Sequence, residues 1–322
     1  MSGPSARSRD LADELRASGL VDTHFHVGPE LLPRRYDVVG LADAVRPWTA
    51  TLVLKNHTYP TTPLAALARR HHGVRLLGGT VLNRFVGGLN PDAVVSAASG
   101  NRSDVAGDGP EPPFVVWMPT VHAAAHIAAL GTAFDPRWSG CAACSDALGD
   151  RTGAAEQPVR VFQDDGTPDP ALLPVLEAIA QAGARLATGH LQANEIERLV
   201  PLALDAGVPA VLITHPHYPS VELSDEQLQR LVRDPRVFAE HCLAVHTIEG
   251  VPLERFVASI AATGFEQVVL STDFGQLQSE PFPDGSIRFA AALDALRPAA
   301  LERAALIAMF SANPRRALGL DP

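Results

Sequence analysis

Cysteine, excess positive charge and long apolar runs are all lacking in this sequence, and each shortage excludes a class of protein. The three cysteines (Cys141, Cys144 and Cys242) are too few for a framework of disulfides, which favours a reducing cytoplasm. Acidic residues outnumber basic ones, 36 to 26, so no partner such as nucleic acid or an anionic membrane is expected. No apolar run could span a bilayer, and the first residues lack the apolar core of a signal peptide. A cytoplasmic protein is therefore expected.

Alternation of short apolar segments with longer amphipathic ones predicts the fold class. Eight segments have the pattern of strands: 20–26, 51–57, 74–83, 114–120, 184–190, 210–216, 236–242 and 267–273. Helices are expected over 62–72, 91–99, 170–183, 192–206, 224–233 and 252–263. Eight strand–helix units in series predict an α/β fold of the (β/α)8 TIM-like barrel type, with an open doubly wound sheet as the alternative. We expect a single domain over residues 1–322, with its core at about 20–315.

One segment, 127–169, breaks this alternation and is expected to be a small insertion before the fifth strand. It is rich in Gly, Pro, Asp and Ala. Its phrase "VRVFQDDGTPDP" predicts a strand, a tight turn and the start of a helix. The "CAAC" phrase supplies only Cys141 and Cys144, and a structural zinc site needs four ligands, so we assign these cysteines no role.

The stretch "VDTHFHVGPE", Val21 to Glu30, is the first candidate for a functional site. In a regular strand, Asp22, His24 and His26 share one face, while the residues between them point the other way. Three polar groups on the inner face of a strand are costly to bury unless something binds them. A divalent metal ion would do so.

Further polar residues lie where other predicted strands end, at the edge where barrel enzymes build their active sites. Lys55 and His57 end the second strand, His190 the fifth, His215 and His217 the sixth, Glu240 and His241 the seventh, and Asp273 the eighth. A single histidine at a strand end is usually a hydrogen-bonded core residue. Histidines at three strand ends together with an aspartate at a fourth favour a shared site.

These residues resemble the amidohydrolase superfamily of metal-dependent barrel enzymes. The resemblance rests on "DTHFH", on single histidines closing strands five and six, and on the aspartate closing strand eight. The phrases "LKNHTYPT", "VGGLNP", "VWMPT", "LATGH" and "STDFGQ" are similar to a little-characterised subgroup of that superfamily. The resemblance implies that Asp273 is a metal or water ligand and the general base, and that the other metal ligands are His24, His26, His190 and His215. Such ligands suit zinc, with manganese, iron or cobalt as substitutes.

The fourth strand departs from the pattern of the superfamily. Two-metal members usually carry a bridging carboxylated lysine or a glutamate there, but this strand ends "VVWMPT". Lys55 could be carboxylated and bridge two ions from the second strand, or it could stay cationic and bind a substrate anion beside one ion. Two ions are slightly favoured. Asp273, Lys55 and His215 are the expected catalytic residues.

Several other residues are weaker candidates for contacts with the substrate. His57, His217 and Arg34 lie in segments after strand ends, although solvated loop residues of these types are common. His126 follows the fourth strand and lies four residues after His122, a spacing that can bind metal on a helix; two solvated histidines are the expected explanation.

The favoured function is a metal-dependent hydrolase of the amidohydrolase type. It would use metal-activated water to cleave an amide, cyclic amide, lactone or similar bond of a small organic molecule. The alternatives are a one-metal decarboxylase or other lyase of the same superfamily, and a phosphoesterase. A homo-oligomer is expected. Asp22 is expected either to orient a ligand histidine or to accept backbone hydrogen bonds.

Overall fold

The computed structural model describes residues 6–102, 111–138, 157–299 and 301–320. All eight predicted strands are present, and the segment 74–83 is divided into two. The strands are β1 (Val21–His26), β2 (Thr51–Lys55), β3 (Arg75–Leu77), β4 (Gly79–Val81), β5 (Val115–Trp117), β6 (Arg185–Ala187), β7 (Val211–Thr214), β8 (Val237–Cys242) and β9 (Val268–Ser271).

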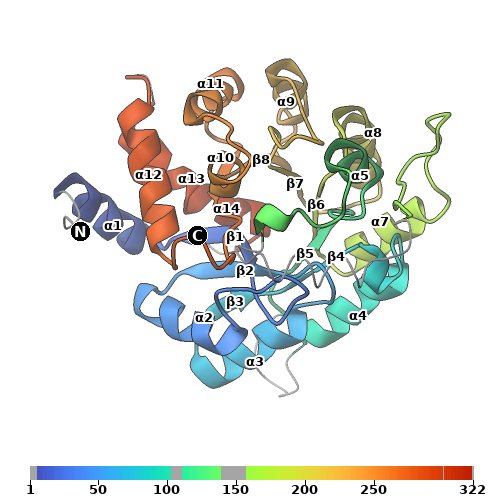
Figure 1. Ribbon diagram of the computed structural model, residues 1–322, viewed down its shortest axis with the longest axis horizontal. Helices are drawn as coiled ribbons and strands as arrows, with labels where there is room; N and C mark the ends of the chain where they lie inside the picture. Colours follow the sequence, from blue (N-terminus) through green and yellow to red (C-terminus); the bar gives the residue numbers. More distant parts are fainter. Residues whose placement is uncertain (1–5, 103–110, 139–156, 300, 321–322) are drawn as a thin grey trace.

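Helices follow nearly every strand and lie around the strands (Figure 1). The six predicted helices are α3 (Thr62–His72), α4 (Pro91–Asn101), α7 (Leu172–Gln181), α8 (Ala193–Asp205), α9 (Asp225–Leu231) and α11 (Leu253–Thr263). The other α-helices are α1 (Ala6–Ser18), α2 (Val38–Val45), α5 (Ala124–Leu130), α10 (Leu243–Thr247), α12 (Asp284–Leu296), α13 (Arg303–Met309) and α14 (Ala312–Leu318). Short 3-10 helices are η1 (Arg46–Trp48), η2 (Arg84–Val86) and η3 (Pro136–Trp138). Among the described helices, none is long and apolar enough to cross a membrane.

Capping side chains explain where two of these helices begin. The Asn90 side chain accepts a hydrogen bond from the backbone N–H of Asp92 at the start of α4. Ser224 and Gln227 form a reciprocal capping box at the start of α9. Asparagine and serine are both residue types that commonly cap the start of a helix.

The strands form two parallel sheets, of order β1-β2-β3 and β4-β5-β6-β7-β8-β9. β3 and β4 are separated by Gly78, where an added Cβ would lie 2.3 Å from the Cα of Thr62 in α3. The interruption therefore lies where a helix approaches the strand so closely that only glycine fits.

The two sheets also adjoin between β1 and β9, where two backbone hydrogen bonds connect β1 to the segment that follows β9. The N–H of Asp273 donates to the carbonyl of His24 (2.9 Å), and the N–H of His26 donates to that of Phe274 (2.7 Å). Both bonds lie just beyond β9, so they do not extend the ladder of β8 and β9. The closed barrel sheet expected from the sequence is therefore not formed as one continuous ladder, although the parallel α/β architecture is confirmed.

The strands nevertheless surround a common apolar core. One buried cluster takes a residue from every strand, from Val21 in β1 to Val269 in β9, and Leu318 of α14 packs into it. A larger cluster fills the space between the strands and the helices. Because all the strand pairs are parallel, the carboxyl ends of the strands lie at one end of this core.

The predicted insertion is only partly within the described residues. Cys141 and Cys144 lie outside them. In the phrase starting at Val159, the expected strand is replaced by isolated bridges of Val159 to Ala123 and of Phe162 to Pro168. The predicted turn is present, with Gly166 in a left-handed conformation.

Candidate metal centre

The two histidines of β1 converge on the carboxylate of Asp273. His24 Nε2 lies 3.1 Å and His26 Nε2 lies 2.9 Å from Asp273 Oδ1. Both imidazoles are buried, and Asp273 follows β9 with a left-handed backbone (φ 56°), a conformation that aspartate tolerates better than most residues. Two imidazole nitrogens and a carboxylate oxygen at this spacing suit a divalent ion such as zinc.

These contacts shift the pKa of each partner. Burial would raise the pKa of Asp273, but the charge and hydrogen bonds of His24 and His26 hold it well below its usual value. Burial would lower the pKa of His24, but the Asp273 carboxylate raises it above its usual value. Asp273 is therefore ionised and able to bind a cation or accept a proton.

An extra residue in β1 changes which of its side chains reach the site. Asp22 pairs with Leu52 of β2, whereas Phe25 pairs with Leu54, so the register slips by one residue between them. As a result, the Thr23 hydroxyl donates to Glu240, the same carboxylate that contacts His24. The expectation that Thr23 faces away from the histidines is wrong because strict alternation fails at this bulge.

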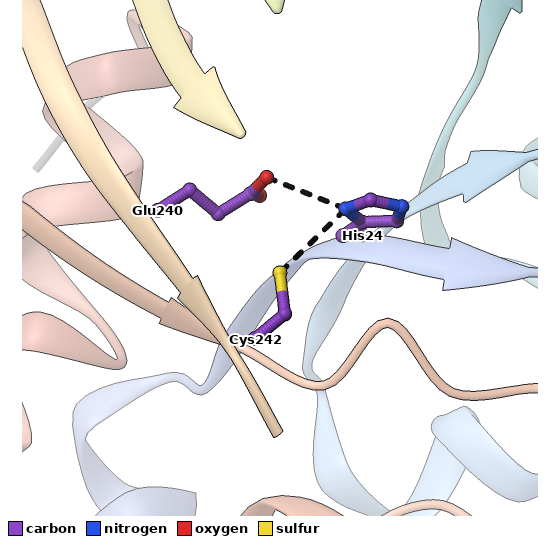
Figure 2. A group of neighbouring side chains, drawn as sticks. All are labelled: His24, Glu240 and Cys242. Carbon is purple, nitrogen blue, oxygen red and sulfur yellow. Dashed lines mark hydrogen bonds and ion pairs between the residues drawn. The ribbon is translucent and has the colours of Figure 1, made fainter. Parts of the chain in front are cut away.

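Glu240 and Cys242 of β8 both point at the inner ring nitrogen of His24 (Figure 2). His24 Nδ1 lies 3.3 Å from Glu240 Oε2 and 3.7 Å from Cys242 Sγ. Burial would raise the pKa of Glu240, but the hydrogen bond from His24 lowers it, and the hydroxyl of Ser271 also donates to Glu240 (3.1 Å). An ionised Glu240 holds the proton of His24 on Nδ1, which leaves Nε2 free to bind a cation on the Asp273 side.

Asp22 accepts backbone hydrogen bonds, which was one of the two roles expected for it. Its carboxylate accepts the backbone N–H groups of His24 (3.0 Å) and Thr272 (3.2 Å) and the hydroxyl of Thr272 (2.5 Å). Burial raises its pKa to about 6. Asp22 therefore ties the end of β1 to the segment that carries Asp273, and Glu240 instead of Asp22 contacts the Nδ1 atom of His24.

His190 and His215 lie next to each other, and His215 lies beside His24. Their ring centroids are 5.0 Å apart, and the rings of His215 and His24 are stacked at 6.0 Å. Nδ1 of His215 is buried and has no hydrogen-bond partner in the described part of the chain. Tyr218 packs against both His190 (4.6 Å) and His215 (4.7 Å), and its buried hydroxyl has no partner there either.

His126 contacts His190 directly. The Nδ1 atoms of the two rings are 2.8 Å apart, and His126 Nε2 lies 3.2 Å from the carbonyl of Ala133. A carbonyl can only accept, so Nε2 of His126 carries a proton, and in the neutral ring Nδ1 is then an acceptor. Burial lowers the pKa of His126 to about 4, which keeps the ring neutral. His190 therefore donates from Nδ1, and its Nε2 has a free lone pair.

The expectation of two solvated histidines on one helical face is wrong for His122 and His126. Both are buried, and α5 begins only at Ala124, so His122 lies in the preceding turn. There its ring packs against Phe85 at 5.0 Å, and its backbone N–H donates to the side chain of Asn83 (3.3 Å). The small residues of "VHAAAH" gave the pattern of a longer helix than the one that forms.

Lys55 is buried at the centre of the site. Its Nζ lies 2.8 Å from His24 Nε2 and 5.5 Å from the centre of the Trp117 ring. Burial lowers the pKa of Lys55, against the opposing effect of Asp273 and Glu240. The second strand thus brings its lysine to the face of His24 that also contacts Asp273.

A pocket opens beside these residues. Its polar walls include His26, Arg34, Lys55, His57, His190 and Asp273, and its apolar walls include Trp138, Val245 and Ile248. Of the four predicted substrate contacts, His57 and Arg34 line the pocket, whereas His126 and His217 do not. His217 lies with His241 outside the site, with ring centroids 5.3 Å apart, against Phe256.

A further set of possible ligands lies at the wall of the pocket. His26, Glu30 and His57 bring ligand atoms within 4.8 Å of one another. Glu30 was not among the predicted site residues, and neither was Tyr218. Both lie in irregular segments, and nothing in the sequence distinguishes them from other loop residues.

Comparison with solved structures identifies the fold. An amidohydrolase from Pseudomonas aeruginosa is similar with a TM-score of 0.56 and 11% identity, over 96% of this chain and 98% of that one. An organophosphorus hydrolase from Deinococcus radiodurans has a TM-score of 0.51 and 13% identity, over 95% and 94%. A putative 2-pyrone-4,6-dicarboxylic acid hydrolase from Pseudomonas putida has a TM-score of 0.51 and 18% identity, over 94% of this chain and 98% of that one. At 11% to 18% identity, these similarities show that this chain shares the fold of those proteins.

The family itself is defined by sequence. Residues 19–240 match the model of a family of unknown function, DUF6282, and the chain belongs to that family. A search of curated proteins finds no match.

Proposed function

We propose that the protein is a metal-dependent hydrolase of the amidohydrolase type, which uses activated water to cleave an amide, cyclic amide, lactone or similar bond of a small organic molecule. The observation that carries the proposal is the convergence of His24, His26 and Asp273, with Glu240 behind His24. The structural neighbours, an amidohydrolase and two hydrolases, support the same class of reaction. As in (β/α)8 barrels, the site would lie at the carboxyl ends of the strands.

The residues present fit a divalent ion. His24, His26 and Asp273 would hold it from one side, and His190 and His215 from the other. The free lone pair on His190 Nε2 and the unpartnered buried Nδ1 of His215 support this set, because buried polar atoms without partners are rare. Imidazole and carboxylate ligands favour zinc, with manganese, iron or cobalt as substitutes.

The chain's own residues have separate tasks in the reaction. A bound ion would supply a water molecule of lowered pKa and would polarise the carbonyl under attack. Asp273 takes the proton of the attacking water on its carboxylate and delivers it to the leaving group, as a general base and then a general acid. Tyr218, whose hydroxyl has no partner among the described residues, donates a hydrogen bond to the substrate. Trp138 and Ile248 exclude bulk water from the pocket.

Lys55 decides between one ion and two. We favour a carboxylated Lys55, which would help to hold two ions, because burial lowers the pKa of Lys55 in the direction of the neutral amine and its Nζ lies beside His24. If Lys55 stays a cation, a single ion is held and Lys55 binds a substrate anion. A one-ion site with a cationic Lys55, and with Arg34 in the same pocket, would favour the decarboxylase alternative. The phosphoesterase alternative would be identified by release of phosphate from the substrate.

Metal content per chain tests the proposal directly. Wild type and Lys55→Ala, purified without chelator, are measured by plasma emission and then assayed on amides, lactones and esters. About two ions in wild type and one in the variant support the bridged site. One ion in both makes Lys55 a substrate contact. No ion in either, after zinc or manganese is supplied, contradicts the proposed function.

A further inference from the structure

Arg34 has an unusual position in the pocket wall. It belongs to the segment after β1, yet its side chain is only 2% exposed. Its Nε donates to Glu30 Oε2 at 2.5 Å, and Glu30 Oε1 accepts the backbone N–H of His57 at 2.5 Å. The next backbone N–H, that of Arg35, donates to the carbonyl of Gly275 (2.8 Å), two residues after Asp273. The guanidinium is therefore held in one orientation beside the metal ligands.

The outer edge of this guanidinium has no acceptor within the described residues. A guanidinium has five N–H donors in a fixed planar arrangement, and Arg34 lines the pocket. Only the Nε donor of Arg34 has a partner there, so four N–H groups on its two Nη atoms remain. Arg137, near the same pocket, differs: its donors are taken by Asp135, by Glu249 and by the carbonyl of Ile248.

Charge and shape indicate what the free edge of Arg34 binds. Two parallel N–H groups match the two oxygens of a carboxylate. Glu30 already neutralises part of the charge of Arg34, so a monoanion is balanced there better than a dianion such as phosphate. The same pocket is also lined by Trp138, Val245 and Ile248, which offer an apolar surface.

We propose that the free Nη edge of Arg34 binds a carboxylate of the substrate, so that the substrate is a small carboxylic acid with an apolar body lying against Trp138 and Ile248. This inference rests on the proposed function and names the substrate class of the same site. The scissile bond would lie toward Asp273 and the carboxylate toward Arg34.

Binding of benzoate tests this inference, with benzamide as the neutral analogue and inorganic phosphate as the alternative anion. Isothermal titration is carried out on zinc-loaded protein and on chelator-treated protein. We expect benzoate to bind both forms, benzamide to bind neither at the same concentrations, and Arg34→Gln to weaken benzoate binding at least about tenfold. Arg35→Gln is the matched control, because Arg35 is exposed and donates to the Leu277 carbonyl.

The variants are designed so that a folding defect is not mistaken for lost binding. Arg34→Gln leaves Glu30 buried without its partner, so the double variant Glu30→Gln/Arg34→Gln removes both charges and should keep the thermal unfolding temperature of wild type. It should still fail to bind benzoate.

Three results would overturn the inference. They are equal benzoate binding by wild type and a folded Arg34 variant, tighter binding of phosphate than of benzoate, and benzoate binding that disappears when zinc is removed. If the protein binds no metal but benzoate binding still depends on Arg34, only the proposed function fails. If metal binds and Arg34 has no effect, only this inference fails.

Discussion

The histidines at the ends of β7 and β8 lie in two different environments, although all three of them occur at the end of a strand in the sequence. His215 stacks on His24 and lies next to His190, within reach of the charges of Asp273 and Glu240. His217, two residues later, packs instead against His241 and Phe256.

The outer pair of histidines, His217 and His241, has no carboxylate bonded to it within the described residues. Both rings pack against Phe256, and both nitrogens of His241 are buried without a partner in that part of the chain. Near them, Arg255 is paired with Asp225. The comparison indicates that carboxylates, and not the histidines themselves, distinguish a candidate metal site from a buried histidine pair.

The largest effect is expected from Asp273→Asn. The amide keeps the shape but removes the charge and the proton acceptor, so we expect most of the bound metal to be lost and any hydrolytic activity to fall by about 10²–10⁴-fold. Plasma emission and the hydrolysis assay measure both. His241→Leu is the control and should retain wild-type metal content. Equal metal content in Asp273→Asn and wild type would remove Asp273 from the ligand set.

Glu240→Gln should have the next largest effect. The neutral amide no longer holds the proton of His24 on Nδ1, so we expect the affinity for zinc to fall about 10–100-fold with the fold intact. Competition with a chromogenic chelator gives the affinity, and circular dichroism checks the fold. An unchanged affinity would show that the contact between Glu240 and His24 does not tune the site.

A smaller loss of zinc affinity is expected for His126→Phe, because His126 would affect the metal only through its contact with His190. Without an acceptor for its Nδ1 proton, His190 can place that proton on Nε2, and zinc affinity should fall about tenfold. His126→Gln restores an acceptor and should recover part of the affinity. His122→Phe is the matched control and should not change it. Equal effects of the His122 and His126 variants would indicate a packing defect only.

The smallest effect concerns the outer pair and is one of stability. Burial holds the pKa of His241 well below its usual value and lowers the pKa of His217 to about 4. The pKa of a histidine in the unfolded chain is about 6.5, so below that pH the unfolded state binds protons that the folded state does not. The free energy of unfolding is therefore unaffected by these two histidines above pH 6.5 and falls as the pH falls toward 4.

His241→Leu should reduce this pH dependence. It removes a buried imidazole without partners among the described residues, so we expect a gain of about 1 kcal/mol in the free energy of unfolding at pH 7. The loss between pH 7 and pH 5 should be smaller than in wild type by on the order of 1 kcal/mol. Urea unfolding of chelator-treated protein measures both, because metal release then plays no part. An unchanged pH dependence would mean that His241 is not the group responsible.

The order and type of the elements were predictable from the sequence. Short apolar segments marked every strand, and amphipathic segments with caps such as Ser224 marked six of the helices, because these signals depend only on neighbours in the chain. The sequence also predicted that His24, His26 and Asp273 would meet, since parallel strands bring their carboxyl ends together.

Only the tertiary structure decided which neighbour of each motif reaches the site. A one-residue bulge in β1 turned Thr23 and His24 toward Glu240, and α5 began after His122, so that His126 could contact His190. Gly78 interrupted the sheet where α3 approaches it. The physical reason is that a local pattern determines the alternation of a strand or the period of a helix, whereas bulges, helix starts and close approaches depend on residues distant in the sequence.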